Sequence, residues 1–276
     1  MVQETKLNIM IPNEKVIDIT TYIASFSGGK DSIAMVLRLI EENKPLDRVA
    51  FIDTELEFGE QNNIIKICER RFKELKPGLE FDYIRPVKTF EEYFYTVKKK
   101  GKFKGQIYGW PFTAGFNSWC NDRLKQRPFR KYQKQFEDDV IIYLGIAADE
   151  PKRLKRLESN RRAPLAEWGM TEKDCLKYIK EKGFWNPMYW KFKRLGCYLC
   201  PKQNNKSLRS LRRHYPMLWE KMLRMDKDSP IPFRADGTTL QELEHRFRYE
   251  ESQRIIAPLQ LVERHLFYEN EQISLL

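Results

Sequence analysis

The sequence predicts an α/β fold built on a doubly wound, mainly parallel β-sheet. Apolar, strand-like runs alternate with amphipathic, helix-like runs between residues 19 and 146, which is the βαβ rhythm of such sheets. The run Val140–Ile146 is largely β-branched and apolar, as a strand is when both faces of a parallel sheet are covered. A glycine-bearing turn joins the first expected strand to the first expected helix.

Each expected element has a local signal. Runs of β-branched, apolar and aromatic residues define the strands Ile19–Phe26, Arg48–Ile52, Glu80–Ile84 and Val140–Ile146. Amphipathic runs define helices that end near Glu42 and Leu75, a short helix that begins at Thr89, and a helix at 176–182 preceded by the N-cap Thr171. The chain from Lys206 onward is expected to be helical.

The turn Ser27–Ser32 reads Ser-Gly-Gly-Lys-Asp-Ser. Gly28 and Gly29 let the backbone turn tightly and approach an anion, and the helix that follows offers free N–H groups and the positive end of its dipole. Lys30 adds a mobile charge. The spacing differs from the Walker A loop and from the Rossmann fingerprint, and it resembles the PP-loop of the N-type ATP pyrophosphatases. A phosphate site is therefore expected, with a ligand-free turn as the alternative.

Asp53 follows the expected strand Arg48–Ile52 directly. Ligands of open α/β sheets bind outside the carboxyl ends of the strands, so Asp53 is placed to hydrogen-bond a ribose or an adenine-bearing nucleoside. Capping of the helix near Glu60–Phe72 is a competing explanation for this carboxylate. The Gly-, Lys- and aromatic-rich segment Lys98–Trp119 predicts a loop or lid over the nucleotide.

Composition narrows the class of protein without naming a reaction. With 276 residues and 41% hydrophobic content, the chain can bury one α/β core and an appendage. No run approaches the roughly 20 apolar residues of a membrane span, and Met1–Lys15 lacks the apolar core of a signal peptide, so no membrane partner and a cytoplasmic location are expected. Five cysteines, an odd number, favour thiol, metal or cluster chemistry over a disulfide framework.

The formal charge of +11 suggests anionic partners. An adenine nucleotide needs only a few cations, whereas RNA or DNA would use a broad basic surface with interspersed aromatic residues. The aromatic residues that could serve are Trp185, Tyr189, Trp190, Phe192 and Tyr198. Charge that merely solubilises exposed helices is the alternative, so charge ranks these hypotheses without deciding between them. The sequence leaves a homodimer open.

Several motifs in a fixed order resemble the phosphoadenosine phosphosulfate (PAPS) reductase family. They are Ser27–Ser32, Asp53-Thr54, the segment from Trp119-Cys120 to Lys125, Gly145–Glu150, the Pro-Leu-x-x-Trp stretch at Pro164–Trp168 and the Gly-Cys-x-x-Cys-Pro turn at Gly196–Pro201. The resemblance covers about residues 19 to 205. It implies an adenine nucleotide α-hydrolase-like domain at residues 1–205, with 206–276 as a helical C-terminal extension.

The resemblance also assigns roles. Lys30 and Asp31 are the candidate catalytic residues. The candidate nucleotide-binding residues are Ser27, Gly28, Gly29, Lys30, Asp31, Ser32, Asp53, Arg123, Lys125, Arg153 and Arg161. The arginines suit planar, bidentate contact with anionic groups, although ordinary surface charge is the alternative for each basic residue. ATP or a related adenine nucleotide and Mg²⁺ are the expected cofactors.

Three cysteines are candidate metal ligands. Cys197 and Cys200 lie in a tight turn that can direct two thiolates at one metal, and Cys120 lies in the segment that approaches this turn in the family. Three soft ligands suit a 4Fe-4S cluster, with zinc as the alternative, and a redox dithiol or two buried thiols remain open. Cys68 and Cys175 occur at positions typical of helix cores, and Cys175 could be recruited as a fourth ligand.

The departures from the reductase pattern shape the expected function. Cluster-bearing reductases have adjacent cysteines where this chain has Cys120-Asn121, and the family's C-terminal nucleophilic cysteine has no counterpart after Cys200. We therefore expect an adenine-nucleotide-binding enzyme that uses ATP for adenylylation or sulfur transfer. A genuine PAPS reductase (or one for the unphosphorylated analogue) and a catalytically silent nucleotide- or nucleic-acid-binding module are the alternatives.

Overall fold

The computed structural model describes residues 20–101, 103–111, 118–136 and 139–253. Five parallel strands form one sheet in the order β3-β2-β1-β4-β5. They are β1 (Thr21–Phe26), β2 (Arg48–Ile52), β3 (Glu80–Ile84), β4 (Val140–Leu144) and the two-residue β5 (Arg161–Arg162). The predicted doubly wound parallel sheet is confirmed, whereas β5 was not predicted.

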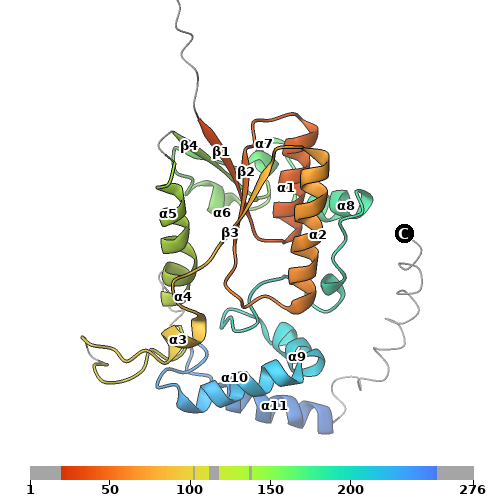
Figure 1. The fold of residues 1–276 in the computed structure, drawn as a ribbon. Coiled ribbons are helices and arrows are strands. Elements are labelled where there is room, and N and C mark those ends of the chain that lie inside the picture. Colours follow the sequence, from red (N-terminus) through yellow and green to blue (C-terminus); the bar gives the residue numbers. More distant parts are fainter. Residues whose placement is uncertain (1–19, 102, 112–117, 137–138, 254–276) are drawn as a thin grey trace, which may run out of the picture.

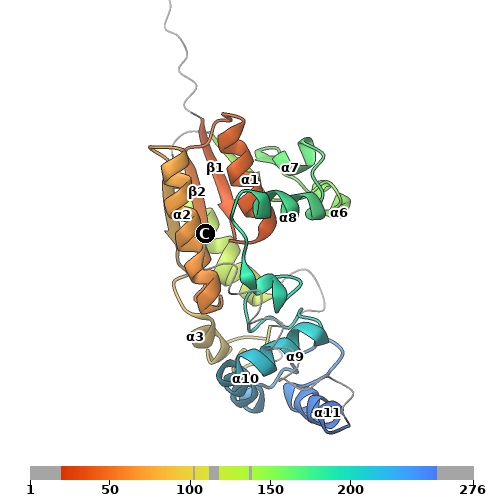
Figure 2. The ribbon, with the colours of Figure 1, turned by 90° about the vertical axis from the view of Figure 1, so that its right-hand side faces the viewer.

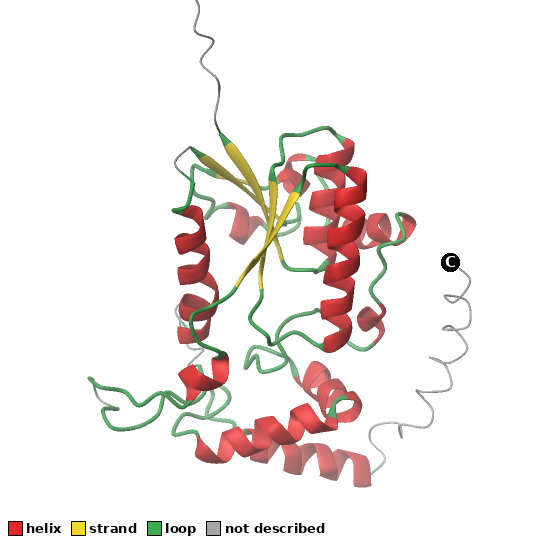
Figure 3. Cartoon of the chain, in the orientation of Figure 1, coloured by secondary structure: helices red, strands yellow, loops and turns green. Residues whose placement is uncertain are grey.

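Helices cover both faces of the sheet (Figure 3). The long helices are α1 (Lys30–Glu41), α2 (Gly59–Leu75), α5 (Arg127–Gln133), α8 (Glu172–Glu181), α9 (Asn205–His214), α10 (Pro216–Asp228) and α11 (Leu240–Ser252). The short helical turns are α3 (Phe90–Phe94), α4 (Trp119–Asn121), the π-helix η1 (Asp122–Gln126), α6 (Pro151–Leu154), α7 (Pro164–Glu167) and the 3₁₀-helix η2 (Pro187–Trp190). None of the described helices is long and apolar enough to cross a membrane.

The alternation of side chains along the strands explains the two layers. Ala24 and Phe26 of β1 pack into one core with α1, α2 and α8. Ile23, which precedes Ala24, points to the opposite face and packs with Phe129 and Tyr132 of α5. The predicted capping of α8 is confirmed, because the Thr171 hydroxyl accepts a hydrogen bond from the Asp174 N–H and Asp174 bonds the Thr171 backbone in return.

The C-terminal helices α9, α10 and α11 lie beyond the carboxyl ends of the strands (Figures 1 and 2). Their apolar faces share a core with earlier residues, among them Phe94, Trp110 and Phe192. The Trp110 indole donates to Asp226 Oδ1 at 2.8 Å inside this core. The division of the chain at residue 205 stays a prediction. Arg254 and His265 of the predicted helical tail lie outside the described residues.

The strand order changes direction between β1 and β4. Successive strands from β1 to β3 are added on one side, and β4 and β5 lie on the other. In open α/β sheets, this switch point leaves a crevice outside the carboxyl ends of the strands, where ligands bind. The turn after β1 is Ser27–Gly29, and the turn after β4 begins at Gly145, so the topology brings both to one place.

Candidate functional site

The PP-loop is a left-handed turn followed directly by a helix. Gly28 has φ +69°, a conformation that glycine adopts without steric cost. Gly29 is extended and caps α1 without a side-chain hydrogen bond. The Ser32 hydroxyl donates to the Gly29 carbonyl at 2.9 Å and accepts from the Ser27 N–H at 3.2 Å. The loop is thereby closed on itself, with the first turn of α1 directed at the crevice.

Buried polar groups hold the loop from behind. The Gln61 amide donates to the Gly28 carbonyl at 2.8 Å, and Asn186 donates to the Gln61 side-chain oxygen at 2.6 Å. A Cβ atom on Gly28 would collide with Gln61 and Ile65. The glycine is therefore required both by its φ angle and by the close approach of α2.

A cleft of about 400 Å³ opens in front of the loop. It is lined by Ser27, Gly29, Lys30, Asp31, Ser32, Gly145, Glu150, Arg153, Glu172, Tyr189, Lys193, Arg194, Leu195 and Asn204. Gly145 allows the close approach of the two turns, because a Cβ atom there would lie 3.0 Å from the Ser32 nitrogen. The structure thus brings together the loop, Asp31 and Arg153 as predicted.

Lys30 is held by two carboxylates in this cleft. Its Nζ lies 2.6 Å from Glu172 Oε2 and 3.0 Å from Asp31 Oδ2. Burial opposes the charged form of Lys30, but the hydrogen bonds to Glu172 and Asp31 outweigh it, so the pKa of Lys30 is raised. Lys30 therefore carries its positive charge at neutral pH and is aligned before any anion arrives.

Asp31 has one carboxylate oxygen without a hydrogen-bond partner in the described part of the chain. Its Oδ1 is buried and has no hydrogen-bond partner among the described residues. Burial raises the pKa of Asp31, and the hydrogen bond from Lys30 offsets only part of that effect. Buried carboxylate oxygens without a partner are costly, and a hard cation such as Mg²⁺ takes oxygen ligands of this kind. Asp31 Oδ1 is therefore a suitable oxygen ligand for Mg²⁺ bound together with a nucleotide.

Tyr189 contacts the loop at the position where an anion is expected. Its hydroxyl accepts a hydrogen bond of 2.7 Å from the Lys30 backbone N–H, the first amide of α1. Burial raises the pKa of Tyr189 to about 12, so the hydroxyl is neutral. The sequence reasoning missed Tyr189, Glu172, Lys193 and Arg194 as cleft residues, because they come from segments far along the chain that carry no phosphate motif.

Other predicted residues lie outside the cleft. Asp53 follows β2 as expected, and its carboxylate lies 3.1 Å from the Arg85 guanidinium and accepts from the Glu55 N–H. It does not cap α2, whose N-cap is Phe58. Arg161 belongs to β5 and bonds Glu158 at 3.0 Å, and it does not line the cleft.

The predicted lid does not cover the cleft with any described residue. Residues 98–101 and 103–111 are absent from the cleft lining, and residues 102 and 112–117 lie outside the described part of the chain. Arg123 donates to the Tyr108 hydroxyl at 2.6 Å and lies over the rings of Tyr93 and Tyr108. Arg123 thus lies among aromatic rings and does not line the cleft.

The three candidate metal ligands lie close to Lys125. Cys197 donates a hydrogen bond to Cys200, and this bond, together with the Lys202 backbone N–H and the charge of Lys125, lowers the pKa of Cys200 to about 6. The same hydrogen bond and burial raise the pKa of Cys197. Burial raises the pKa of Cys120, and the nearby charge of Cys200 raises it further by a smaller amount.

These thiols fit a soft metal in chemistry, but they do not complete a site as placed. Three sulfur donors suit an iron–sulfur cluster or zinc. Within the described residues, however, no group of three His, Cys, Asp or Glu side chains is arranged to hold a metal ion. Cys68 and Cys175 are buried in the sheet core, where burial raises the pKa of each to about 12. The metal assignment stays a prediction.

The family comparison matches the range that contains these features. Residues 21–203 match the model of the phosphoadenosine phosphosulfate reductase domain. The chain belongs to that family. The matched range includes the PP-loop, Asp53 and the cysteines at 120, 197 and 200, so the family resemblance predicted from the motifs is confirmed. The family is one of nucleotide-utilising enzymes.

Several curated proteins are similar to this chain. An uncharacterized protein of Methanocaldococcus jannaschii is 31% identical over 212 residues, which cover 72% of this chain and 40% of the relative. A second one from the same organism is 28% identical over 210 residues, covering 71% and 45%. An uncharacterized nin region protein of Escherichia phage lambda is 28% identical over 186 residues, covering 59% and 60%. The chain thus spans about half the length of the curated relatives it matches.

Two solved structures are also similar. The phosphate complex of a PAPS reductase from Candida auris gives a TM-score of 0.43 at 16% identity, covering 64% of this chain and 81% of that one. The U34-tRNA thiolase NcsA from Methanococcus maripaludis, solved with its 4Fe-4S cluster, gives 0.39 at 14% identity, covering 84% and 72%. At these scores the likeness places no individual side chain.

Proposed function

We propose that the PP-loop cleft binds ATP and that the chain adenylylates an acceptor in preparation for sulfur transfer. The observation that carries the proposal is the arrangement in the cleft of the first turn of α1, the prealigned Lys30 and the unpartnered Asp31 Oδ1. Together they offer backbone amides and a cation for phosphate oxygens and a ligand for Mg²⁺. A strand-to-helix turn that binds no ligand does not require this combination of residues.

The residues divide the work on the nucleotide. The α1 amides and Lys30 bind the β- and γ-phosphates, and Arg153, Lys193 and Arg194 line the cleft where they can contact the remaining anionic oxygens. Asp31 would hold Mg²⁺, which offsets the charge of the leaving pyrophosphate. An acceptor oxygen attacks the α-phosphate, the bond to pyrophosphate breaks, and the acceptor carbon becomes open to a sulfide or thiolate, with AMP as the leaving group.

The thiols supply the proposed link to sulfur. Cys197, Cys200 and Cys120 would hold an iron–sulfur cluster or zinc, and a cluster with an unligated iron would supply a carrier for sulfide. The charge of Lys125 favours the thiolate form of all three. Burial nonetheless raises the pKa of Cys120, and the hydrogen bond to Cys200 and burial raise that of Cys197. The protein's own contribution is therefore a cationic, half-buried setting for three sulfur atoms.

Isotope exchange between labelled pyrophosphate and ATP tests the proposal. Exchange is expected in the presence of the acceptor, which is sought by adding cellular RNA, DNA and small-molecule extracts in turn, and Lys30→Ala should abolish it. Lys177→Ala, which removes an exposed lysine of α8 that pairs with Glu181, serves as the matched control and should keep wild-type exchange. AMP and pyrophosphate are the expected products.

Each rival has its own signature. Robust release of sulfite from PAPS with a thiol reductant would make the chain a reductase and overturn the proposal. ADP as the sole product would show that ATP is cleaved between its β- and γ-phosphates, which would overturn adenylylation. Tight ATP binding without exchange or turnover in any extract would indicate a silent binding module.

A further inference from the structure

One segment carries almost all of the net charge of this chain. Thirteen lysines and arginines and three acidic residues lie between Arg85 and Lys134, a net +10 in a chain whose total is +11. The rest of the sequence is therefore nearly neutral, at +1. Such a concentration of one sign is the electrostatic footprint of a polyanionic partner.

The fold gathers this segment on one side of the molecule. It runs from the carboxyl end of β3 through α3, a hairpin closed by the antiparallel bridge between Val97 and Ile107, and on to α5. Figure 1 shows the hairpin in yellow, extending away from α3 and the sheet. Next to α5, a cavity of about 690 Å³ is lined by Arg123, Arg127 and Lys131 and by the rings of Tyr83, Tyr93 and Tyr132. Asp82 also lines it, and its carboxylate is bonded to Arg48 and to the Tyr132 hydroxyl. We call the described residues of this segment, 85–101, 103–111 and 118–134, the basic surface.

Most described cations of the basic surface form no ion pair with a described carboxylate. Only Arg85, Arg127 and Arg130 form ion pairs with described carboxylates, those of Asp53 and Asp122. The other two acidic residues of the segment are also occupied, since Glu91 pairs with Lys221 and Glu92 completes the capping box of α3. The exposed Lys99, Lys100, Lys104 and Lys131 form no ion pair with any carboxylate that the structure describes.

Exposed apolar side chains gather on the same side. Of the nine large hydrophobic residues that are exposed in the described part of the chain, five lie at or near this segment: Tyr83, Val87, Tyr95, Val97 and Phe103. Phe103 is 41% exposed and lies under Lys98 Nζ, 4.9 Å from the ring centroid. Exposed rings among unpaired cations are the combination on which the bases and phosphates of a single strand bind.

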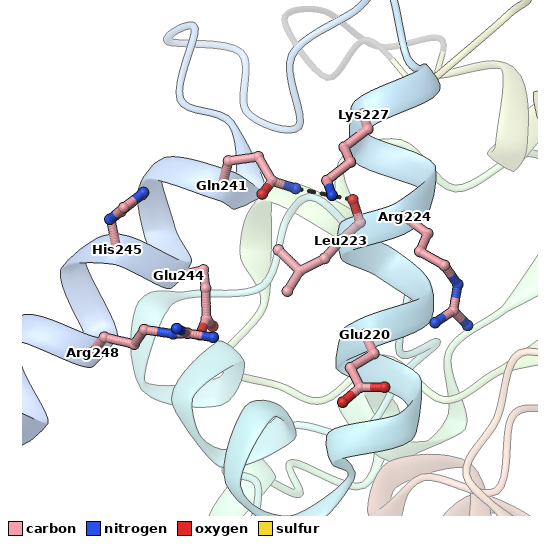
Figure 4. Close-up of a pocket in the computed structure, with 8 residues that line it drawn as sticks. All are labelled: Glu220, Leu223, Arg224, Lys227, Gln241, Glu244, His245 and Arg248. Atoms are coloured by element: carbon pink, nitrogen blue, oxygen red, sulfur yellow. Dashed lines mark hydrogen bonds and ion pairs between the residues drawn. The ribbon is translucent and has the colours of Figure 1, made fainter.

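The other basic regions are worse candidates. The aromatic run 185–198 was one expectation, but Phe192 and Tyr198 are buried and Tyr189 faces the PP-loop. In the C-terminal helices, Arg209, Arg212, Arg246 and Arg248 each bond Glu244 or Glu250. The cleft between α10 and α11 contains Glu220 and Glu244 beside its cations (Figure 4). A polyanion there would meet carboxylates.

We propose that the basic surface binds single-stranded nucleic acid, with phosphates on the hairpin lysines and bases against the exposed rings and the cavity beside α5. This deepens the proposed function by naming its acceptor class, and in that respect it rests on that function. Arg85 lines the cavity and bonds Asp53 at the carboxyl end of β2. The PP-loop follows the carboxyl end of the neighbouring parallel strand β1, at the same edge of the sheet. A nucleotide held in the cavity would contact Arg85 at this edge of the sheet.

Fluorescence anisotropy with the whole chain tests the proposal. The probes are labelled, mixed-sequence RNA and DNA single strands of about 20 nucleotides, which exceed the usual site size, the matching duplex, and a poly-glutamate peptide of equal charge. Single strands should bind most tightly, and comparison of the RNA and DNA arms identifies which of the two is preferred. Binding of the duplex or the peptide as tightly as the single strands would overturn the proposal.

Two variants assign the binding to this surface. The triple variant Lys99→Ala, Lys100→Ala, Lys104→Ala should weaken single-strand binding at least about tenfold and lower the slope of log K against log salt by about 2, because each phosphate contact contributes about 0.7. Phe103→Ala should weaken it about tenfold through lost stacking. The control Lys66→Ala, Lys73→Ala, Lys177→Ala removes the same charge from the exposed faces of α2 and α8 and should bind as the wild type does.

The failures of the two proposals can be told apart. If the control triple weakens binding as much as the hairpin triple, or if Phe103→Ala has no effect, the surface assignment is wrong. ATP binding is measured separately by calorimetry on the same variants, which should all retain it. If a variant loses nucleic-acid binding but still binds ATP, the result bears only on the basic surface. If it loses ATP binding but still binds nucleic acid, the result bears only on the PP-loop.

Discussion

In the PP-loop cleft, Lys30 lies within hydrogen-bond distance of Asp31 and Glu172, and Arg153 is held by Glu150. On the basic surface, Lys99 and Lys131 form no ion pair with any described carboxylate. Paired cations are fixed in direction and present little net charge, which suits a small anion that must be positioned for a reaction. Unpaired cations give a strong, salt-sensitive field, which suits a polyanion. One chain thus contains both paired cations in a cleft and, on an exposed surface, cations that pair with no described carboxylate.

The largest expected effect concerns the three thiols that could hold a metal, Cys120, Cys197 and Cys200. The double variant Cys197→Ser, Cys200→Ser should lose nearly all bound metal after anaerobic purification, because thiolate–metal free energies are on the order of 10 kcal/mol. Iron, sulfide and zinc analysis of the purified protein gives the readout.

Cys68→Ala provides the control, since Cys68 is buried in the sheet core, and it should keep the wild-type metal content. Full metal occupancy in the double variant would remove these cysteines from the metal site.

The next effect in size concerns the stability of the fold and tests how tightly α2 packs against the PP-loop at Gly28. Gly28→Ala should destabilise the fold by about 2 to 4 kcal/mol, because it combines a positive φ with the collision against Gln61 and Ile65. Gly78→Ala has a similar φ of +88° but open space around it, so it should cost only about 1 kcal/mol. Equal midpoints in urea denaturation for the two variants would show that the close approach of α2 is not tight.

The C-terminal helices offer a pH test of what ion pairing contributes, because their arginines are paired with carboxylates. Hydrogen bonds from Arg209 and then Arg246 lower the pKa of Glu250 to about 2, below its ordinary value of about 4.3. The folded state therefore gains stability from this carboxylate above about pH 4.3 and loses it as the pH falls toward 2.

Glu250→Gln should accordingly be less stable than the wild type by about 1 to 2 kcal/mol at pH 7, with the gap closing between about pH 4.3 and 2. Urea denaturation of both proteins across this range measures it. A gap that is constant with pH would mean that the ion pairs do not lower the pKa of Glu250.

The smallest expected effect concerns Tyr189, which accepts a hydrogen bond from the first amide of α1. Tyr189→Phe should bind ATP more tightly by about 0.5 to 1.5 kcal/mol, because no intramolecular hydrogen bond has to be broken to free that amide. Tyr178→Phe removes a hydroxyl that bonds Glu41 outside the cleft and should leave ATP affinity unchanged in calorimetry. Weaker ATP binding by Tyr189→Phe would make the hydroxyl a contact of the nucleotide.

The sheet could be predicted because its signals are local. The strands at Arg48–Ile52 and Glu80–Ile84 match the structure residue for residue, and β4 begins at Val140 as expected but ends at Leu144. The first strand begins at Thr21, and Ile19 lies outside the described residues. β5 was missed because Arg161-Arg162 has neither the length nor the apolar character of a strand, and its arginines suggested anion binding instead.

The cleft could be predicted only in part, because half of it comes from tertiary contacts. The PP-loop carries a recognisable local pattern, and Arg153 was assigned through the family resemblance. Glu172 reads as an ordinary first-turn acid of α8, and Tyr189 as one aromatic residue among several, so nothing local indicates that both contact Lys30. The sequence shows the excess of positive charge, but only the structure shows which cations are paired.

Calorimetric titration with ATP and Mg²⁺ tests the central claim, that an adenine nucleotide binds through the PP-loop, most directly. Lys30→Ala should weaken binding by about 1.5 to 3 kcal/mol, the range for a hydrogen bond to a charged group, while the control Lys177→Ala should bind as the wild type does. Equal affinity of the wild type and Lys30→Ala would contradict the account and remove the PP-loop as the nucleotide site.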